Sequence, residues 1–191
     1  MMKFFRLEVL ALLLTVVAFE SQALTLTPAD CTVGSCWTTD VNSQLTADSI
    51  ETLVGSSVEL TELYKSEVDD GDSGLFDDYL ETTYSNLATD PADALIELLD
   101  GYAIDCSDCY ISIKDGNQDP ALYVFSLSDW LGTDDITLLD FWPDQGAISN
   151  IALWGGVDSN VYETASVPEP STLTLFGLSL LGLGLFGRRK A

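Results

Sequence analysis

Residues 110–125 read YISIKDGNQDPALYVF, and they carry the clearest signal for the fold. Apolar and polar residues alternate in YISIK, which is the pattern of a strand with one buried face. The segment DGNQDP that follows is rich in residues that favour chain reversal, and ALYVF then provides a second apolar strand. The stretch therefore predicts a β-hairpin.

Further strand-like runs lie on both sides of this hairpin. They recur about every ten residues and are separated by polar turn residues, and residues 46–53 are the only short helix indicated in this part of the sequence. Such spacing favours an all-β fold, a single antiparallel β-sandwich of the jelly-roll or immunoglobulin-like type. The further runs are residues 58–68, 78–86, 94–99, 136–141 and 147–154, and the second hairpin strand is expected to span residues 122–127.

The first 23 residues have the composition of a secretory signal peptide. Lys3 and Arg6 precede an apolar run at residues 9–19, and the small residues Ser21 and Ala23 follow at the spacing of a cleavage site. We therefore expect residues 1–23 to be cut off after Ala23 and the protein to be exported. The alternative is a buried N-terminal helix. That alternative would leave the basic residues before the apolar run and the small residues after it without a role.

A proline-containing tripeptide, an apolar run and a basic cluster follow one another at the other end of the sequence. An apolar helix of 17 residues would cover about 25 Å, somewhat less than the bilayer core of about 30 Å. Basic residues beside a membrane helix favour the cytoplasmic side, so the preceding domain would face outward. The three parts are Pro168-Glu169-Pro170, residues 171–187, and Arg188-Arg189-Lys190.

Together, the two ends resemble the PEP-CTERM family of exported bacterial proteins, whose members join a signal peptide to a Pro-Glu-Pro motif, an apolar span and an Arg-rich end. The resemblance implies that a membrane-embedded exosortase recognises and removes residues 168–191 as a sorting tail. It also implies a Gram-negative host that makes exopolysaccharide, an inner-membrane intermediate held by a transient helix, and a final place at the cell surface or outside the cell. The expected sorting residues are Pro168, Glu169, Pro170, Arg188 and Arg189.

A second resemblance covers part of the region between the two ends. Through the segments 113–117, 123–125, 130–133, 141–143, 146–150 and 153–155, residues 72–155 are similar to a β-rich module that recurs in PEP-CTERM proteins. This resemblance supports the fold class, and it implies no catalytic residues. The expected organisation is thus a signal peptide at 1–23, an acidic β domain at 24–167 and the sorting tail at 168–191.

Residues 24–167 are strongly acidic. They contain 28 of the 31 Asp and Glu residues but only two basic residues, Lys65 and Lys114, which gives a formal charge of −26. Nucleic acid and anionic lipid surfaces are therefore excluded as partners on electrostatic grounds. Such acidity usually keeps a protein soluble. The more specific alternative is that some of the carboxylates bind calcium.

The best calcium candidates are Asp70, Asp72, Asp78 and Glu81, since calcium takes six to eight oxygen ligands. If the segment is read as an EF-hand loop that begins at Asp70, however, two positions do not match. Its fifth residue is not a calcium ligand, and the position of the invariant glycine holds another residue. Its flanks also look like strands, so a solvated Asp-Gly-Ser turn competes with any metal loop. We therefore expect no cofactor, with calcium as the alternative.

All four cysteines of the chain lie in the acidic domain. Export favours two disulfides, and we favour the local pairs Cys31 with Cys36 and Cys106 with Cys109, although three connectivities are open. The same spacings could form a four-thiolate zinc site.

The chain contains no histidine, which removes Ser-His-Asp and Cys-His catalysis and His-ligated metal centres. We therefore expect no enzyme, although a pair of carboxylates could still hydrolyse glycans. Tryptophans could instead offer flat faces to sugar rings, and Trp142, in a turn-like stretch before Pro143, is the candidate most expected to be exposed. Tryptophans on strands more often pack in a core.

The most favoured function is a structural or interaction role in an exopolysaccharide-associated envelope. The alternatives are a glycan- or calcium-binding module and a carboxylate-based glycan enzyme.

Overall fold

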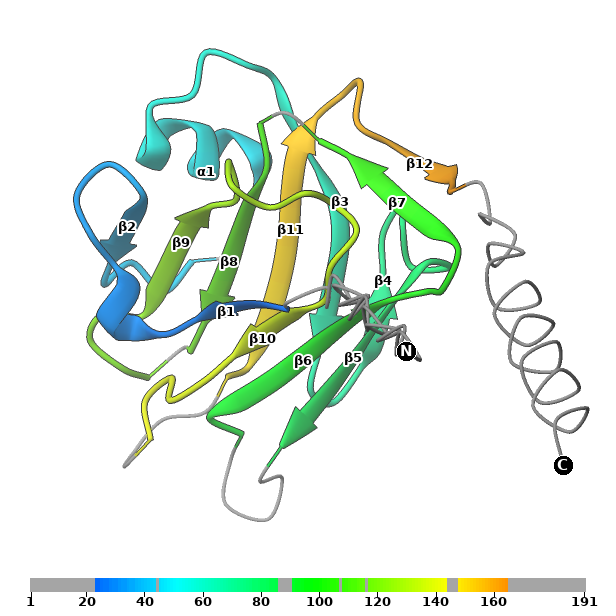
Figure 1. Cartoon of the computed structure of the whole chain (residues 1–191). Coiled ribbons are helices and arrows are strands. Elements are labelled where there is room, and N and C mark those ends of the chain that lie inside the picture. Colours follow the sequence, from blue (N-terminus) through cyan, green and yellow to red (C-terminus); the bar gives the residue numbers. More distant parts are fainter. Residues whose placement is uncertain are drawn as a thin grey trace, which may run out of the picture.

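A computed structural model describes residues 23–164 of the chain, apart from residues 44, 86–90, 107, 116 and 144–147 (Figure 1). Regular structure in this part is mostly β-strand, so the predicted all-β class is confirmed. The predicted signal peptide, except for Ala23, and the predicted sorting tail lie outside the described residues. Within the described part of the chain, no helix is long and apolar enough to cross a membrane.

The larger of the two main sheets has six strands, and all its neighbouring strands are antiparallel. The predicted hairpin lies inside it, with Ile111 opposite Phe125 and Ile113 opposite Tyr123. In spatial order the strands are β2 (Cys36–Thr39), β9 (Leu122–Ser126), β8 (Tyr110–Lys114), β11 (Asn150–Gly156), β3 (Leu60–Glu67) and β4 (Gly71–Ser73).

The second main sheet has four strands. Two of its three pairings are antiparallel, but β1 runs parallel to β10, with Leu24 opposite Ile136. The expectation of a wholly antiparallel fold is therefore wrong at this edge. A parallel pair needs a long connection, and here most of the domain lies between the two strands. In spatial order the strands are β1 (Leu24–Leu26), β10 (Ile136–Leu138), β6 (Asp93–Leu98) and β5 (Leu80–Ser85).

The two main sheets contribute to one hydrophobic core. The six-stranded sheet contributes alternate residues of its central strands, including Ile111 and Ile113 on β8 and Ile151 and Leu153 on β11. Burying one such side chain stabilises the fold by about 1.5–3 kcal/mol. The four-stranded sheet contributes a matching set, namely Leu26, Leu80, Ala94, Ile96, Ile136 and Leu138.

The other face of the six-stranded sheet is covered in part by helix α1 (Ala47–Val54), where residues 46–53 were predicted to be helical (Figure 1). Thr46 begins the helix as its N-cap and accepts a hydrogen bond from the Ser49 backbone N–H, and Gly55 ends it in the left-handed conformation. Ile50 packs from the helix into a second cluster with residues of the sheet, namely Leu60, Leu122, Val124, Ala152 and Trp154.

Both predicted disulfides are present. Cys31 pairs with Cys36 and Cys106 with Cys109, across Cα–Cα distances of 4.8 Å and 5.5 Å. The alternative of a four-thiolate zinc site is thereby overturned, because all four sulfur atoms are used in these bonds.

Every strand predicted from the sequence is found, but five short ones were not predicted. They have three or four residues each, which is too short for an alternating pattern to stand out. Two of them, β7 (Tyr102–Asp105) and β12 (Asn160–Glu163), form a separate antiparallel pair beside the main sheets (Figure 1). The other three are β1, β2 and β4, and β4 lies in the Asp-Gly-Ser segment that was expected to be a turn.

Gly132 brings a loop close to strand β7. Its carbonyl oxygen accepts a hydrogen bond of 2.8 Å from the Ile104 backbone N–H, and its φ is 70°. A Cβ atom at this position would overlap the carbonyl oxygen of Ile104. This contact therefore requires glycine for its conformation and for its size.

We expect Gly132→Ala to lower the free energy of unfolding by about 2–4 kcal/mol, because the left-handed conformation and the overlap both penalise alanine. Gly55→Ala is the matched control, since Gly55 has φ 72° and open space around it. Its expected loss is only about 1–2 kcal/mol. Urea unfolding measures both, and equal losses would contradict the role given to the close approach.

Candidate functional site

A groove of about 920 Å³ lies where β5, β6 and the start of β7 meet. We call it the acidic groove, because most of its polar lining is carboxylate. Among the described residues, no cationic side chain lines it. Its carboxylates come from Asp72, Asp77, Asp78, Glu81, Glu97, Asp100 and Asp135.

Two tyrosines give the acidic groove aromatic faces. Tyr79 lies in the turn before β5 and Tyr102 begins β7, and their ring centroids are 4.9 Å apart with the rings tilted by 58°. The Leu99 backbone N–H donates to the Tyr79 carbonyl oxygen at 2.9 Å, and the Tyr102 N–H donates to that of Leu99 at 3.2 Å. Both rings are half-buried, so each is held in place while part of it faces solvent.

Backbone groups fix two of the carboxylates. Asp135 accepts a hydrogen bond of 3.0 Å from the Leu98 N–H, and Asp72 accepts one of 3.3 Å from the Thr82 N–H. Glu81 lies directly opposite Glu97 in the pairing of β5 with β6. Like charges in that position cost stability, so the groove favours a partner that offers hydrogen-bond donors or positive charge.

The structure brings together three of the four calcium candidates. Asp72, Asp78 and Glu81 line the acidic groove, whereas Asp70 lies in the exposed turn between β3 and β4 and is not part of the lining. The flanking elements are strands, as expected for a segment that is not an EF-hand. Among the described residues, no group of three or more His, Cys, Asp or Glu side chains is arranged to hold a metal ion.

Trp142 is half-buried instead of exposed, so that expectation is wrong. Its indole N–H donates to the Pro120 carbonyl oxygen at 3.0 Å, and its ring packs on Tyr123 with centroids 5.4 Å apart. Trp130 likewise packs against the core, and Trp154 is fully buried. Trp142 is also absent from the lining of the acidic groove.

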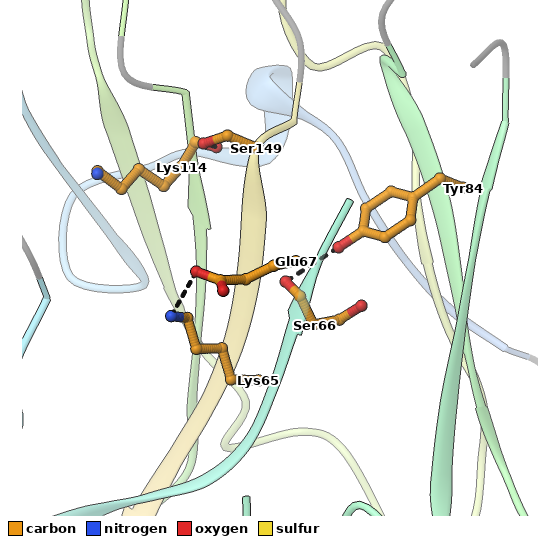
Figure 2. A network of polar contacts seen from close by, with 6 residues as sticks. All are labelled: Lys65, Ser66, Glu67, Tyr84, Lys114 and Ser149. Atoms are coloured by element: carbon orange, nitrogen blue, oxygen red, sulfur yellow. Dashed lines mark hydrogen bonds and ion pairs between the residues drawn. The ribbon is translucent and has the colours of Figure 1, made fainter. Parts of the chain in front are cut away.

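A second, smaller groove lies on the face of the six-stranded sheet that also carries α1. We call it the lysine groove, because Lys65 and Lys114 both line it. Figure 2 shows these two side chains extending to the same side of the sheet, with Glu67 beside Lys65. The groove encloses about 310 Å³, and its other lining residues are Asn42, Ser43, Leu45, Glu62, Glu67, Asn150, Ala152 and Trp154.

The charges of the lysine groove are partly paired. Lys65 forms an ion pair with Glu67, with 2.6 Å between its Nζ and the carboxylate Oε1. Burial raises the pKa of Glu62, the ammonium of Lys65 opposes that rise, and the negative charge of Glu67 adds to it. We did not predict this groove from the sequence, although both lysines occupy polar positions within predicted strands.

Comparison with protein families matched one part of the chain, residues 166–190. These residues are a PEP-CTERM protein-sorting motif. The PEP-CTERM match agrees with the predicted tail and includes its five expected sorting residues, Pro168, Glu169, Pro170, Arg188 and Arg189. Comparison with curated proteins and with solved structures found no match.

The PEP-CTERM motif indicates an exported protein that an exosortase processes and that is sorted through the membrane to the cell surface. The described domain is therefore the part of the chain that the motif delivers. Its two disulfides suit an oxidising exterior.

Two tyrosines of the described domain form hydrogen bonds between the main sheets. The Tyr84 hydroxyl on β5 donates to the Ser66 carbonyl oxygen on β3 at 3.1 Å (Figure 2), and the Tyr64 hydroxyl lies 2.7 Å from Thr82 Oγ1. Burial raises the pKa of Tyr84 to about 12, and it raises that of Tyr64 as well. These hydrogen bonds connect β5, at the edge of the four-stranded sheet next to the acidic groove, with β3 of the six-stranded sheet.

We expect the free energy of unfolding to fall as the pH rises from 10 towards 12. The unfolded pKa of tyrosine is about 10, so burial of neutral Tyr84 stabilises the fold fully below pH 10, and this contribution is lost as the pH passes through the folded value. Tyr84→Phe should reduce the slope above pH 10 by up to about 1.4 kcal/mol per pH unit. Urea unfolding at several pH values measures this slope.

Tyr162→Phe on β12 is the control, because Tyr162 is 47% exposed. If Tyr84→Phe leaves the slope as steep as this control does, Tyr84 does not carry the alkaline sensitivity.

Proposed function

We propose that the exported domain has a structural and interaction role in an exopolysaccharide-associated envelope, without catalytic activity. In this proposal a Gram-negative cell holds the precursor in its inner membrane by a transient C-terminal helix until exosortase cuts it. The PEP-CTERM motif supports the route, and the acidic, disulfide-bonded β domain suits a place outside the cell. We also propose that the two main sheets form a β-sandwich, whose shared core supports this description.

The observation that best supports an interaction with polysaccharide is the lining of the acidic groove. Carboxylates accept hydrogen bonds from sugar hydroxyls, and the faces of Tyr79 and Tyr102 can pack against sugar rings. A volume of about 920 Å³ lies within the usual range of small-ligand sites, about 300–1,000 Å³. The groove therefore suits a hydroxyl-rich, uncharged stretch of a glycan chain.

Retention of the secreted protein on immobilised polysaccharide from the producing bacterium tests this role. We expect clear retention, weakened about 2- to 12-fold by Tyr102→Ala, because an aromatic contact contributes about 0.5–1.5 kcal/mol. Tyr162→Ala is the matched control, since Tyr162 is exposed and lies outside the groove lining. Melting curves of both variants show whether they are folded. No retention, or equal retention of both folded variants, would argue against the proposal.

Calcium binding in the same groove is the second candidate function. The like-charge pair of Glu81 and Glu97 supports it, because a cation between or beside these carboxylates would relieve their repulsion. Asp72 and Asp78 line the same groove and could add ligands. Side-chain adjustment would then complete the site, since calcium coordination is flexible.

Calcium should raise the Tm by about 5 °C when its concentration is far above Kd, and a chelator should reverse the rise. Asp72→Asn combined with Asp78→Asn should reduce this shift. Asp70→Asn is the matched control, because Asp70 lies outside the groove lining. A Tm that does not respond to calcium, or a response that Asp70→Asn removes equally, would reject this candidate.

A further inference from the structure

The positively charged side chains of the predicted mature domain lie in one place. Residues 24–167 contain 28 acidic residues and two lysines, and the fold places both lysines in the lysine groove. Lys65 and Lys114 are 49 positions apart in the sequence, and the pairing of β3 and β8 with β11 brings them to one sheet face. The groove is therefore the part of this domain best suited to attract an anionic group.

The shape of the groove follows from the register of three strands. Asn150 of β11 lies between Lys114 of β8 and Glu67 of β3. Ala152 lies next along β11, with Lys65 as its neighbour on β3. Residues of all three strands therefore line the groove together.

The two lysines differ in their pairing. Lys65 is held by Glu67, and its side chain is 26% exposed. The Lys114 ammonium makes no ion pair with any residue that the structure describes. Figure 2 shows Lys114 directed away from the sheet on the side where the Lys65–Glu67 pair lies. Among the residues that the structure describes, Lys114 is therefore more available to a ligand than Lys65 is.

We propose that the lysine groove binds a carboxylate-bearing sugar unit, with Lys114 paired to the carboxylate and Asn150 and Glu67 hydrogen-bonded to ring hydroxyls. This inference rests on the proposed function, because it assigns a second type of unit in the same polysaccharide. Asn150 supplies both donors and an acceptor, and the carboxylate of Glu67 accepts. A volume of about 310 Å³ is at the lower end for ligand sites and suits one or two sugar rings.

The charge balance of the groove favours a singly charged carboxylate over a phosphate. Glu62 and Glu67 also line the groove, so a dianion would meet two negative groups at short range. The surrounding acidic domain adds to this repulsion, but salt limits its range to about 8 Å at physiological ionic strength. A direct contact with Lys114 acts at a shorter distance and is screened less.

Isothermal titration calorimetry of the secreted protein tests the proposal with three probes: D-glucuronate, its methyl ester and D-glucose. We expect measurable binding of glucuronate and at least tenfold weaker binding of the two uncharged probes. Lys114→Gln should weaken glucuronate binding at least tenfold. Ser128→Asp is the matched control, because it changes the net charge by the same amount at an exposed residue outside the groove lining, and it should leave binding unchanged.

Equal binding of glucose, an unchanged affinity in folded Lys114→Gln, or no binding of any probe would each overturn the proposal. Weakening by Ser128→Asp as strong as that by Lys114→Gln would overturn it too, since net charge alone would then explain the effect. Retention on the native polysaccharide tests the proposed function separately. Retention without glucuronate binding rejects only this inference, whereas glucuronate binding without retention rejects the envelope role.

Discussion

The whole structure depends on burying both faces of the central strands β8 and β11. On one face, Ile111, Ile113, Ile151 and Leu153 share a core with the four-stranded sheet. On the other, Trp154 is buried near helix α1, and its indole N–H donates to Ser112 Oγ at 2.8 Å. Because α1 covers only part of this second face, the lysine groove lies on the same face, between residues of the sheet and residues 42, 43 and 45 before the helix. One groove is thus a direct result of how the sheet is covered.

Local patterns predicted seven of the twelve strands that the structure describes, the helix, the disulfides and the sorting motif. Residues 110–114 alternate along a single strand, and residues 166–190 are recognised without any tertiary contact. The grooves could not be predicted in this way. The acidic groove joins Asp72 to Glu97 across two sheets, and the exposure of Trp142 depends on its contact with Pro120, 22 positions away. These features follow from strand pairing, which no short segment encodes.

The two grooves present different chemical groups on the surface of one acidic domain. One presents carboxylates around a tyrosine pair, and the other gathers the two lysines of residues 24–167. A polymer that alternates uncharged and carboxylated units would find complementary chemistry at both. If both grooves bind as proposed, two weak sites on one domain would hold such a chain more firmly than either site alone.

Strand β12 also places a limit on the geometry of processing. It ends at Glu163, and Pro168 follows five positions later, so an extended chain would separate them by at most about 17 Å. While β12 is paired with β7, a folded domain therefore stands within this distance of the Pro-Glu-Pro tripeptide. An enzyme that cut there would meet the folded domain within this distance, so the shape of this end of the domain would affect how closely the enzyme can approach the tripeptide.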